Sequence, residues 1–216
     1  MAAPPTIDVA SDPVNPPSFE PNYCSYTNIR CQRVVTPIQV VFILTFKTLK
    51  NMSSVTFQGK PVQLQSVLPK KGDKAADFTA VKPDLSEISL KDLRGKKVLL
   101  NIFPSVDTGV CAKSVREFNK RAAEVEGCEV LCLSMDLPFA LGRFCAAEGI
   151  ERVTTASVFR SKEFEGYGLK MQDGPLAGLC ARTVICLDGE GTIIYEQLVP
   201  EIGEEPDYDA ALNALK

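Results

Sequence analysis

The chain has 216 residues, a formal net charge of −3 and a hydrophobic fraction of 45%, and it contains no histidine. Its length and apolar content fit one globular domain with a short appendage. The nearly balanced charge argues against a nucleic-acid-binding protein, which usually carries a basic patch. The missing imidazole excludes Ser-His-Asp and Cys-His catalysis and every histidine-ligated metal site.

Residues 1–51 differ in composition from the rest. They hold seven of the 15 prolines, and residues 1–29 carry three acidic side chains and no basic one. We therefore expect a disordered or non-native leader over 1–51. The apolar stretch 34–49 is shorter and more interrupted than the roughly 20 apolar residues of a membrane span. A signal anchor, or a natural start at Met52, remain the alternatives for this segment.

From Met52 onward, the first predicted elements are strands. Two short β-patterned runs, 55–57 and 62–64, surround a turn that contains Gly59, which predicts a β-hairpin. Strands at 77–81 and 88–90 follow. The run 97–103 is almost continuously apolar, as in a central strand that is covered on both faces.

Helices and strands then alternate. Apolar side chains recur at helical spacing over 112–125, and a strand at 129–134 and a helix at 138–148 follow. A short helix is expected at 159–166, two strands at 183–187 and 192–199, and a final helix at 207–215. This order predicts an α/β sandwich with a mixed sheet, formed by residues 52–216.

One cysteine stands where the central strand turns into the next helix. Cys111 follows the segment Phe-Pro-Ser-Val-Asp-Thr-Gly-Val and falls in the first helical turn. The free backbone N–H groups and the positive end of the helix dipole favour a thiolate there. Because cysteine attacks as a thiolate, Cys111 is a candidate nucleophile. Without histidine, its activation must come from the helix terminus, local N–H donors and an arginine.

The other seven cysteines form no C-x-x-C pair, so a zinc ribbon or a thioredoxin-type dithiol is not supported. Cys132 and Cys186 lie inside apolar runs and are expected to be small buried hydrophobic residues. The same chain has a core-sized apolar content, which argues against a small scaffold held together by disulfides.

The pattern Pro104-x-x-x-Thr108-x-x-Cys111 resembles the active-site motif of the peroxiredoxins, and the wider string 101–111 resembles their thiol peroxidase subfamily, the atypical two-cysteine type. Further blocks match in order: 136–140, 143–145 with Gly149, and 205–208. The resemblance runs from about Met52 to Lys216. It implies a thioredoxin-like α/β sandwich in which helices flank a central mixed β-sheet, with an N-terminal β-hairpin.

The resemblance also implies roles for site residues. Cys111 is the peroxidatic nucleophile, Thr108 places its hydroxyl beside the sulfur, and Pro104 shields the site. Thr108 can equally be a plain helix N-cap. Arg182, at the start of an apolar strand, would sit over the thiolate and hold the peroxide. The alternative is a strand-end arginine that reaches solvent.

By the same resemblance, Cys145 is the resolving cysteine, which forms an intramolecular disulfide with Cys111. The alternative is a buried cysteine beside Phe144 on an amphipathic helix face. A disulfide needs Cα atoms about 4.4–6.8 Å apart. Two cysteines on separate packed helices are expected to start farther apart, so we expect the turns around both to unwind on oxidation.

The function implied is a thiol-dependent peroxidase that reduces hydrogen peroxide and organic hydroperoxides and is recycled by thioredoxin. No metal, haem or flavin is implied, because the electrons come from thiols. The expected partner is a second copy of the chain; neither nucleic acid nor stable membrane association is expected. A cytoplasmic location is favoured, with the periplasm or an organelle as alternatives. A redox-signalling or holdase protein switched by Cys111 oxidation, and a non-catalytic binding domain, are the rival functions.

Overall fold

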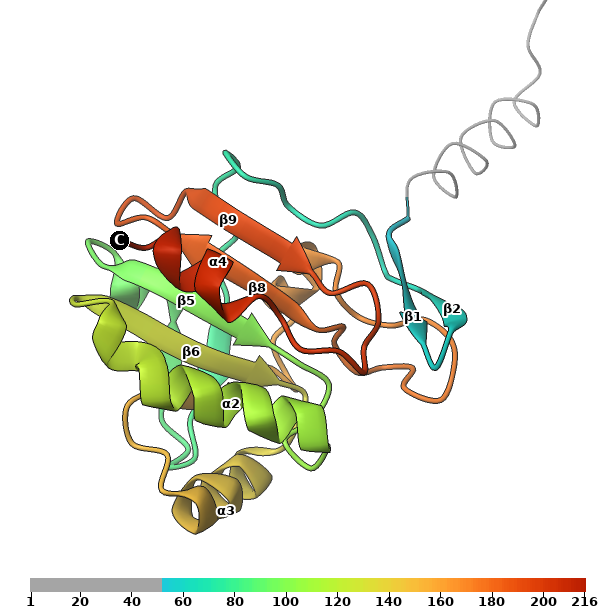
Figure 1. The fold of residues 1–216 in the computed structure, drawn as a ribbon, viewed down its shortest axis with the longest axis horizontal. Coiled ribbons are helices and arrows are strands. Elements are labelled where there is room, and N and C mark those ends of the chain that lie inside the picture. The colour runs from blue at the N-terminus through green and yellow to red at the C-terminus, as the bar shows by residue number, and fades with distance from the viewer. Residues whose placement is uncertain (1–51) are drawn as a thin grey trace, which may run out of the picture.

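The computed structural model describes residues 52–216 (Figure 1). Residues 1–51, on which the leader expectation falls and which include Cys24 and Cys31, lie outside the described residues. The domain begins with the predicted hairpin, in which β1 (Ser54–Phe57) pairs antiparallel with β2 (Lys60–Gln63). Its two turn residues, Gln58 and Gly59, have φ angles of 53° and 74°. Such positive angles match the twist of a tight hairpin turn.

A seven-stranded mixed sheet forms the centre of the domain, in the order β4-β3-β7-β6-β5-β8-β9. The strands β5, β6 and β7 run parallel, and the other neighbours pair antiparallel. Their bounds are β3 (Thr79–Val81), β4 (Glu87–Ser89), β5 (Lys97–Ile102), β6 (Cys128–Ser134), β7 (Thr154–Ser157), β8 (Thr183–Leu187) and β9 (Ile193–Leu198). The predicted mixed sheet is confirmed, and β7 is the strand that the sequence pattern did not predict.

Three α-helices are described: α2 (Gly109–Arg121), α3 (Pro138–Glu148) and α4 (Tyr208–Asn213). The bounds of α3 are as predicted, because Pro138 suits a first turn and Gly149 ends the helix at a φ of 63°. The short helix predicted at 159–166 is instead a 3-10 helix, η3 (Glu163–Tyr167). Two further 3-10 helices are η1 (Leu90–Leu93) and η2 (Ala122–Glu124).

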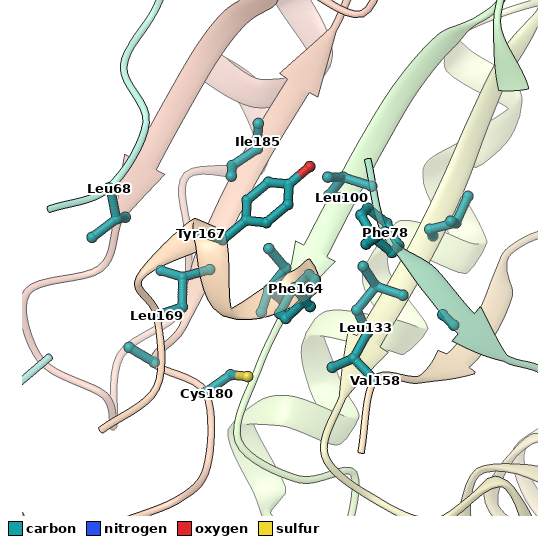
Figure 2. Close-up of a cluster of buried hydrophobic side chains, with 14 of the residues drawn as sticks. Leu68, Phe78, Leu100, Leu133, Val158, Phe164, Tyr167, Leu169, Cys180 and Ile185 are labelled. Atoms are coloured by element: carbon teal, nitrogen blue, oxygen red, sulfur yellow. The ribbon is translucent and has the colours of Figure 1, made fainter. Parts of the chain in front are cut away.

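Two clusters of buried apolar side chains cover the two faces of the sheet. On one face, Phe78 meets the rings of Phe164 and Tyr167 edge-on, with centroids 5.3 and 5.8 Å apart. Figure 2 shows these rings packed over Leu100 and Leu133. On the other face, the second cluster joins side chains from α2, α3 and α4 to the sheet. Figure 1 shows α2 and α4 lying over the central strands.

Alternation along β5 decides which side chains meet α2. Leu100 belongs to the first cluster, whereas Leu99 belongs to the second, together with Phe103 in the loop beyond the strand. Since successive side chains point to opposite faces, Asn101 also lies on the α2 face. Within residues 52–216, no helix combines the length and the apolar character that a bilayer crossing requires.

Candidate active site

Cys111 lies at the amino end of α2, close to the edge of the sheet where β5 ends. The chain leaves β5 at Ile102, and α2 begins at Gly109. Thr108 occupies the N-cap position, which puts Cys111 in the first turn. The residue is fully buried. Its sulfur therefore sits near the free N–H groups of the helix, away from bulk water, as the strand-to-helix pattern predicts.

Arg182 is brought to this sulfur by the antiparallel pairing of β5 and β8. In that pairing Ile102 faces Thr183, so the residue before β8 stands beside the active-site loop. Arg182 Nη2 donates to Cys111 Sγ at 3.3 Å. The side chain is 1% exposed, so it does not reach solvent. The structure thus places a buried guanidinium against the candidate nucleophile.

The guanidinium is aimed by one backbone carbonyl. Arg182 Nε and Nη2 donate to the carbonyl of Ile202 at 3.2 and 3.1 Å. That carbonyl belongs to a segment bound to the hairpin: Ile202 N–H donates to Thr56 O at 2.9 Å, and Thr56 N–H donates to Pro200 O at 2.7 Å. Arg182 Nη1 is buried and has no hydrogen-bond partner among residues 52–216. The Nη1 group of the guanidinium is therefore not engaged by any acceptor in the described part of the chain.

For the peroxidase activity that the sequence resemblance implies, removing this guanidinium should slow peroxide reduction strongly. We expect Arg182→Met to lower the second-order rate constant with peroxide by about 100- to 1,000-fold, the usual effect of losing one aimed donor. Arg182→Lys keeps the charge but not the fork geometry, so its loss should be smaller. Stopped-flow measurement of Cys111 oxidation tests this, with the exposed Arg160→Met as the control. A folded Arg182→Met protein with a near-native rate would contradict the assignment.

The loop before α2 holds Thr108 and Pro104. The hydroxyl of Thr108 donates to the carbonyl of Ser105 at 3.0 Å and caps no helix N–H. The structure therefore places Thr108 three residues before Cys111 without bonding its hydroxyl to the sulfur. Pro104 is buried, two residues after the end of β5.

Asp136 fixes this loop to the end of β6. Its carboxylate accepts from the backbone N–H of Val106 and from the hydroxyl of Ser134, both at 2.8 Å. Hydrogen bonds to a charged acceptor are stronger than neutral ones. Asp136 thus ties the active-site loop to the sheet. The sequence offered one signal for this residue, its place in the block 136–140.

Glu205 adds a carboxylate close to Arg182. It accepts from Lys113 Nζ at 2.5 Å and from the hydroxyl of Tyr208 at 2.9 Å. The hydrogen bonds from Lys113 and Tyr208, together with the charges of Lys113 and Arg182, hold the pKa of Glu205 below its usual range. Sequence reasoning gave Glu205 no role, although it lies in the matching block 205–208.

Cys145 lies on α3, half-buried at the margin of the second cluster. Its Sγ is 3.1 Å from the hydroxyl oxygen of Thr155 on β7. All six cysteines of the described chain are free thiols, so neither Cys111 nor Cys145 takes part in a disulfide in this structure. Both thiols border the same cluster of apolar side chains.

The four remaining described thiols are held in the neutral form. Burial raises the pKa of Cys132, Cys180 and Cys186 to about 12 and that of Cys128 to about 11. At neutral pH these groups stay protonated, and a protonated thiol is a poor nucleophile. Burial of Cys132 and Cys186 in the second cluster confirms the prediction made from their apolar surroundings.

These raised pKa values predict a loss of stability in alkali. An unfolded thiol ionises near its ordinary pKa of 9.0, whereas folded Cys186 keeps its proton until about 12. The stabilisation is therefore complete below pH 9 and is lost as the pH rises towards 12. Between pH 8 and 10, Cys186 should account for about 1 kcal/mol of the fall in unfolding free energy. Urea denaturation at both values should give a correspondingly smaller fall for Cys186→Ala; an unchanged fall would refute this.

Comparison with known proteins identifies the family of this chain. Residues 70–212 match the Redoxin family model. The chain is 56% identical to the thiol peroxidase of Corynebacterium glutamicum over 164 residues, which is 76% of this chain and 99% of that relative. It is 52% identical, over the same shares, to the thiol peroxidase of Mycobacterium bovis.

Solved structures of similar proteins also include a peroxiredoxin-like protein and a thiol peroxidase. A peroxiredoxin-like protein from Aquifex aeolicus matches with a TM-score of 0.73 and 41% identity, covering 76% of this chain and 97% of that one. The thiol peroxidase from Chromobacterium violaceum, at 21% identity and a TM-score of 0.69, shares the fold, over 75% of this chain and 94% of its own. The chain belongs to the Redoxin family. Within it, the protein is a peroxiredoxin, a thiol-dependent peroxidase, and the expected thioredoxin-like fold is confirmed.

Proposed function

We propose that Cys111 is the peroxidatic cysteine of this peroxidase. Its thiolate attacks one oxygen of a hydroperoxide, the O–O bond breaks, and the departing oxygen takes up a proton and leaves as water or an alcohol. Cys111 becomes a sulfenic acid. The observation that carries this proposal is the 3.3 Å contact between Arg182 Nη2 and Cys111 Sγ, in a buried site at a helix amino end.

The surroundings of the sulfur support each part of this step. The guanidinium charge and the helix dipole favour the anionic sulfur that the attack requires. The free Nη1 donor of Arg182 is available to bond the peroxide oxygen as negative charge builds up on it. Pro104, which has no N–H, would keep solvent from the site, and Thr108 would hold the incoming peroxide once its hydroxyl turns from Ser105.

Cys145 is the resolving cysteine in this proposal. Its thiol attacks the sulfenic sulfur of Cys111, a disulfide forms, and water leaves. Thioredoxin then returns two electrons and two protons through its own dithiol, which restores both thiols. The substrates proposed are hydrogen peroxide and organic hydroperoxides.

Disulfide formation would require α3 to loosen. The polar links from α3 to the α2 region are weak: Arg143 reaches Asp107 at 3.7 Å, and Glu148 reaches Arg116 at 3.1 Å, between side chains that are at least one-third exposed. Amide hydrogen exchange should therefore quicken in the first turn of α2 and around Cys145 after oxidation. Equal protection in the reduced and oxidised proteins would contradict the unwinding.

A homodimer is also part of the proposal. Leu137 and Phe139, at the start of α3, are 51% and 66% exposed, and they directly follow Asp136, which holds the active-site loop. Such apolar side chains next to the site suit a contact with a second copy. Sedimentation velocity distinguishes a dimer from a monomer. The proposed compartment is the cytoplasm, where thiols such as those described here are kept reduced.

The test of the proposed chemistry is a mass measurement. One equivalent of peroxide should remove two hydrogens from one chain, and peptide mapping should then find Cys111 linked to Cys145. In the Cys145→Ser protein, the same treatment should leave a sulfenic acid on Cys111 that dimedone traps. Dimedone on another cysteine, or a disulfide that omits Cys111, would overturn the assignment.

A further inference from the structure

A row of three buried side chains, each with an atom that can take part in hydrogen bonds, crosses the sheet beneath α2 and α3. In the pairing of β5 with β6, Asn101 stands opposite Cys132, and in the pairing of β6 with β7, Cys132 stands opposite Thr155. Asn101 and Cys132 are fully buried, and Thr155 is 4% exposed. Directly paired residues on parallel strands share a face, so all three lie on the side of the second cluster, where Cys132 is found.

One end of this row is bound to the turn that carries Cys111. Asn101 Nδ2 donates to Ser114 Oγ at 3.3 Å and to Cys132 Sγ at 3.5 Å. Ser114 Oγ in turn donates to the backbone carbonyl of Cys111 at 2.8 Å. The first turn of α2 is thereby connected to the sheet by buried hydrogen bonds, which hold a segment more firmly than exposed ones.

The other end of the row holds the thiol of Cys145. The hydroxyl of Thr155 lies 3.1 Å from Cys145 Sγ, and this contact is partly buried. The ion pair between α3 and the active-site loop, Arg143 with Asp107, is exposed, and exposed pairs contribute little. The contact with Thr155 is thus a specific polar restraint on the Cys145 side chain itself.

We propose that Thr155 is a positioning residue that retains the Cys145 thiol on the sheet and so sets the lifetime of the Cys111 sulfenic acid. This inference rests on the proposed function, in which Cys145 resolves that acid. Before Cys145 can attack, its sulfur must leave the Thr155 hydroxyl. A hydrogen bond of ordinary net strength changes such a release equilibrium by about fivefold.

The lifetime of the sulfenic acid decides between two products. If Cys145 attacks, a disulfide and water form. If a second peroxide molecule arrives first, it transfers one oxygen to the sulfenic acid, which becomes a sulfinic acid, and water or an alcohol leaves. Retention of Cys145 by Thr155 therefore makes the protein more sensitive to excess peroxide.

Matched substitutions separate the hydroxyl from the shape of the side chain. Thr155→Val removes the hydroxyl and keeps a branched side chain that suits a strand, whereas Thr155→Ser keeps the hydroxyl. We expect Thr155→Val to form the disulfide about fivefold faster and to need about fivefold more peroxide for half-conversion to sulfinic acid. Thr155→Ser should match the wild type, and all three proteins should form the sulfenic acid at the same rate.

Rapid acid quenching followed by intact mass measurement reports each species over time. Equal or slower disulfide formation in Thr155→Val, with wild-type sulfenic acid formation, would overturn the inference, as would equal acceleration in Thr155→Ser. Should Thr155→Val not fold, Thr155→Ala must show the same acceleration. Peptide mapping of the wild type separates the two claims, because the absence of a Cys111–Cys145 linkage would defeat the proposed function instead.

Discussion

Replacing Cys111 with serine should abolish thioredoxin-linked peroxide reduction, with a loss of at least about 1,000-fold. The hydroxyl that replaces the thiol stays protonated beside Arg182, whereas a thiolate is the species that attacks. Serine also has no sulfur on which the sulfenic acid intermediate could form. Consumption of NADPH in a coupled thioredoxin assay measures the loss.

Cys128→Ser is the matched control for this experiment. Cys128 is half-buried at the start of β6, and burial raises its pKa to about 11, so it should not react at neutral pH. The control protein should keep near-native activity. Full steady-state activity in the Cys111→Ser protein would remove the catalytic assignment, and with it the argument from the Arg182 contact.

Replacing Cys145 with serine should stop turnover while sparing the first oxidation. Cys111 remains buried against Arg182 in this protein, so the rate of its reaction with the first peroxide should be unchanged. The sulfenic acid then has no partner thiol on the chain. Each chain should consume one equivalent of peroxide and then stall, and the coupled thioredoxin assay should fall to its background.

The control for this second experiment is Cys180→Ser, which alters a buried thiol on the face of the sheet opposite to α3. It should turn over as the wild type does if the protein folds, which thermal unfolding reports. Sustained thioredoxin-linked turnover in Cys145→Ser would show that another thiol or an external one resolves the acid, and Cys145 would lose its role.

Sequence periodicity was sufficient for most of the fold because the long elements carry strong patterns. The run 97–103 is almost continuously apolar, which indicates a buried strand. The helix 138–148 has a proline at its start and a glycine just after its end, which mark its bounds. Strand β7, Thr154–Ser157, gave no such signal. Its small, mostly polar residues form a strand because β6 and β3 pair with its two edges, and that pairing is tertiary.

The site was predictable to a different degree for each residue. The position of Cys111 in a first helical turn follows from local pattern alone. The contact of Arg182 with that sulfur joins two residues that are 71 positions apart in the chain. It depends on the register between β5 and β8, which no local pattern encodes. The role of Thr155 was not predictable from sequence because, like β7, it depends on a tertiary contact. Its partner Cys145 lies across the interface between α3 and the sheet.

The hairpin at the beginning of the described domain has a consequence for reactivity. Thr56 forms backbone hydrogen bonds with Pro200 and Ile202, and the Ile202 carbonyl orients the Arg182 guanidinium beside the Cys111 sulfur. The amino-terminal hairpin, far from Cys111 in sequence, therefore helps to orient the Arg182 guanidinium beside the Cys111 sulfur. A fusion partner or a ligand that displaced this hairpin would change the reactivity of Cys111 without contacting either Cys111 or Arg182.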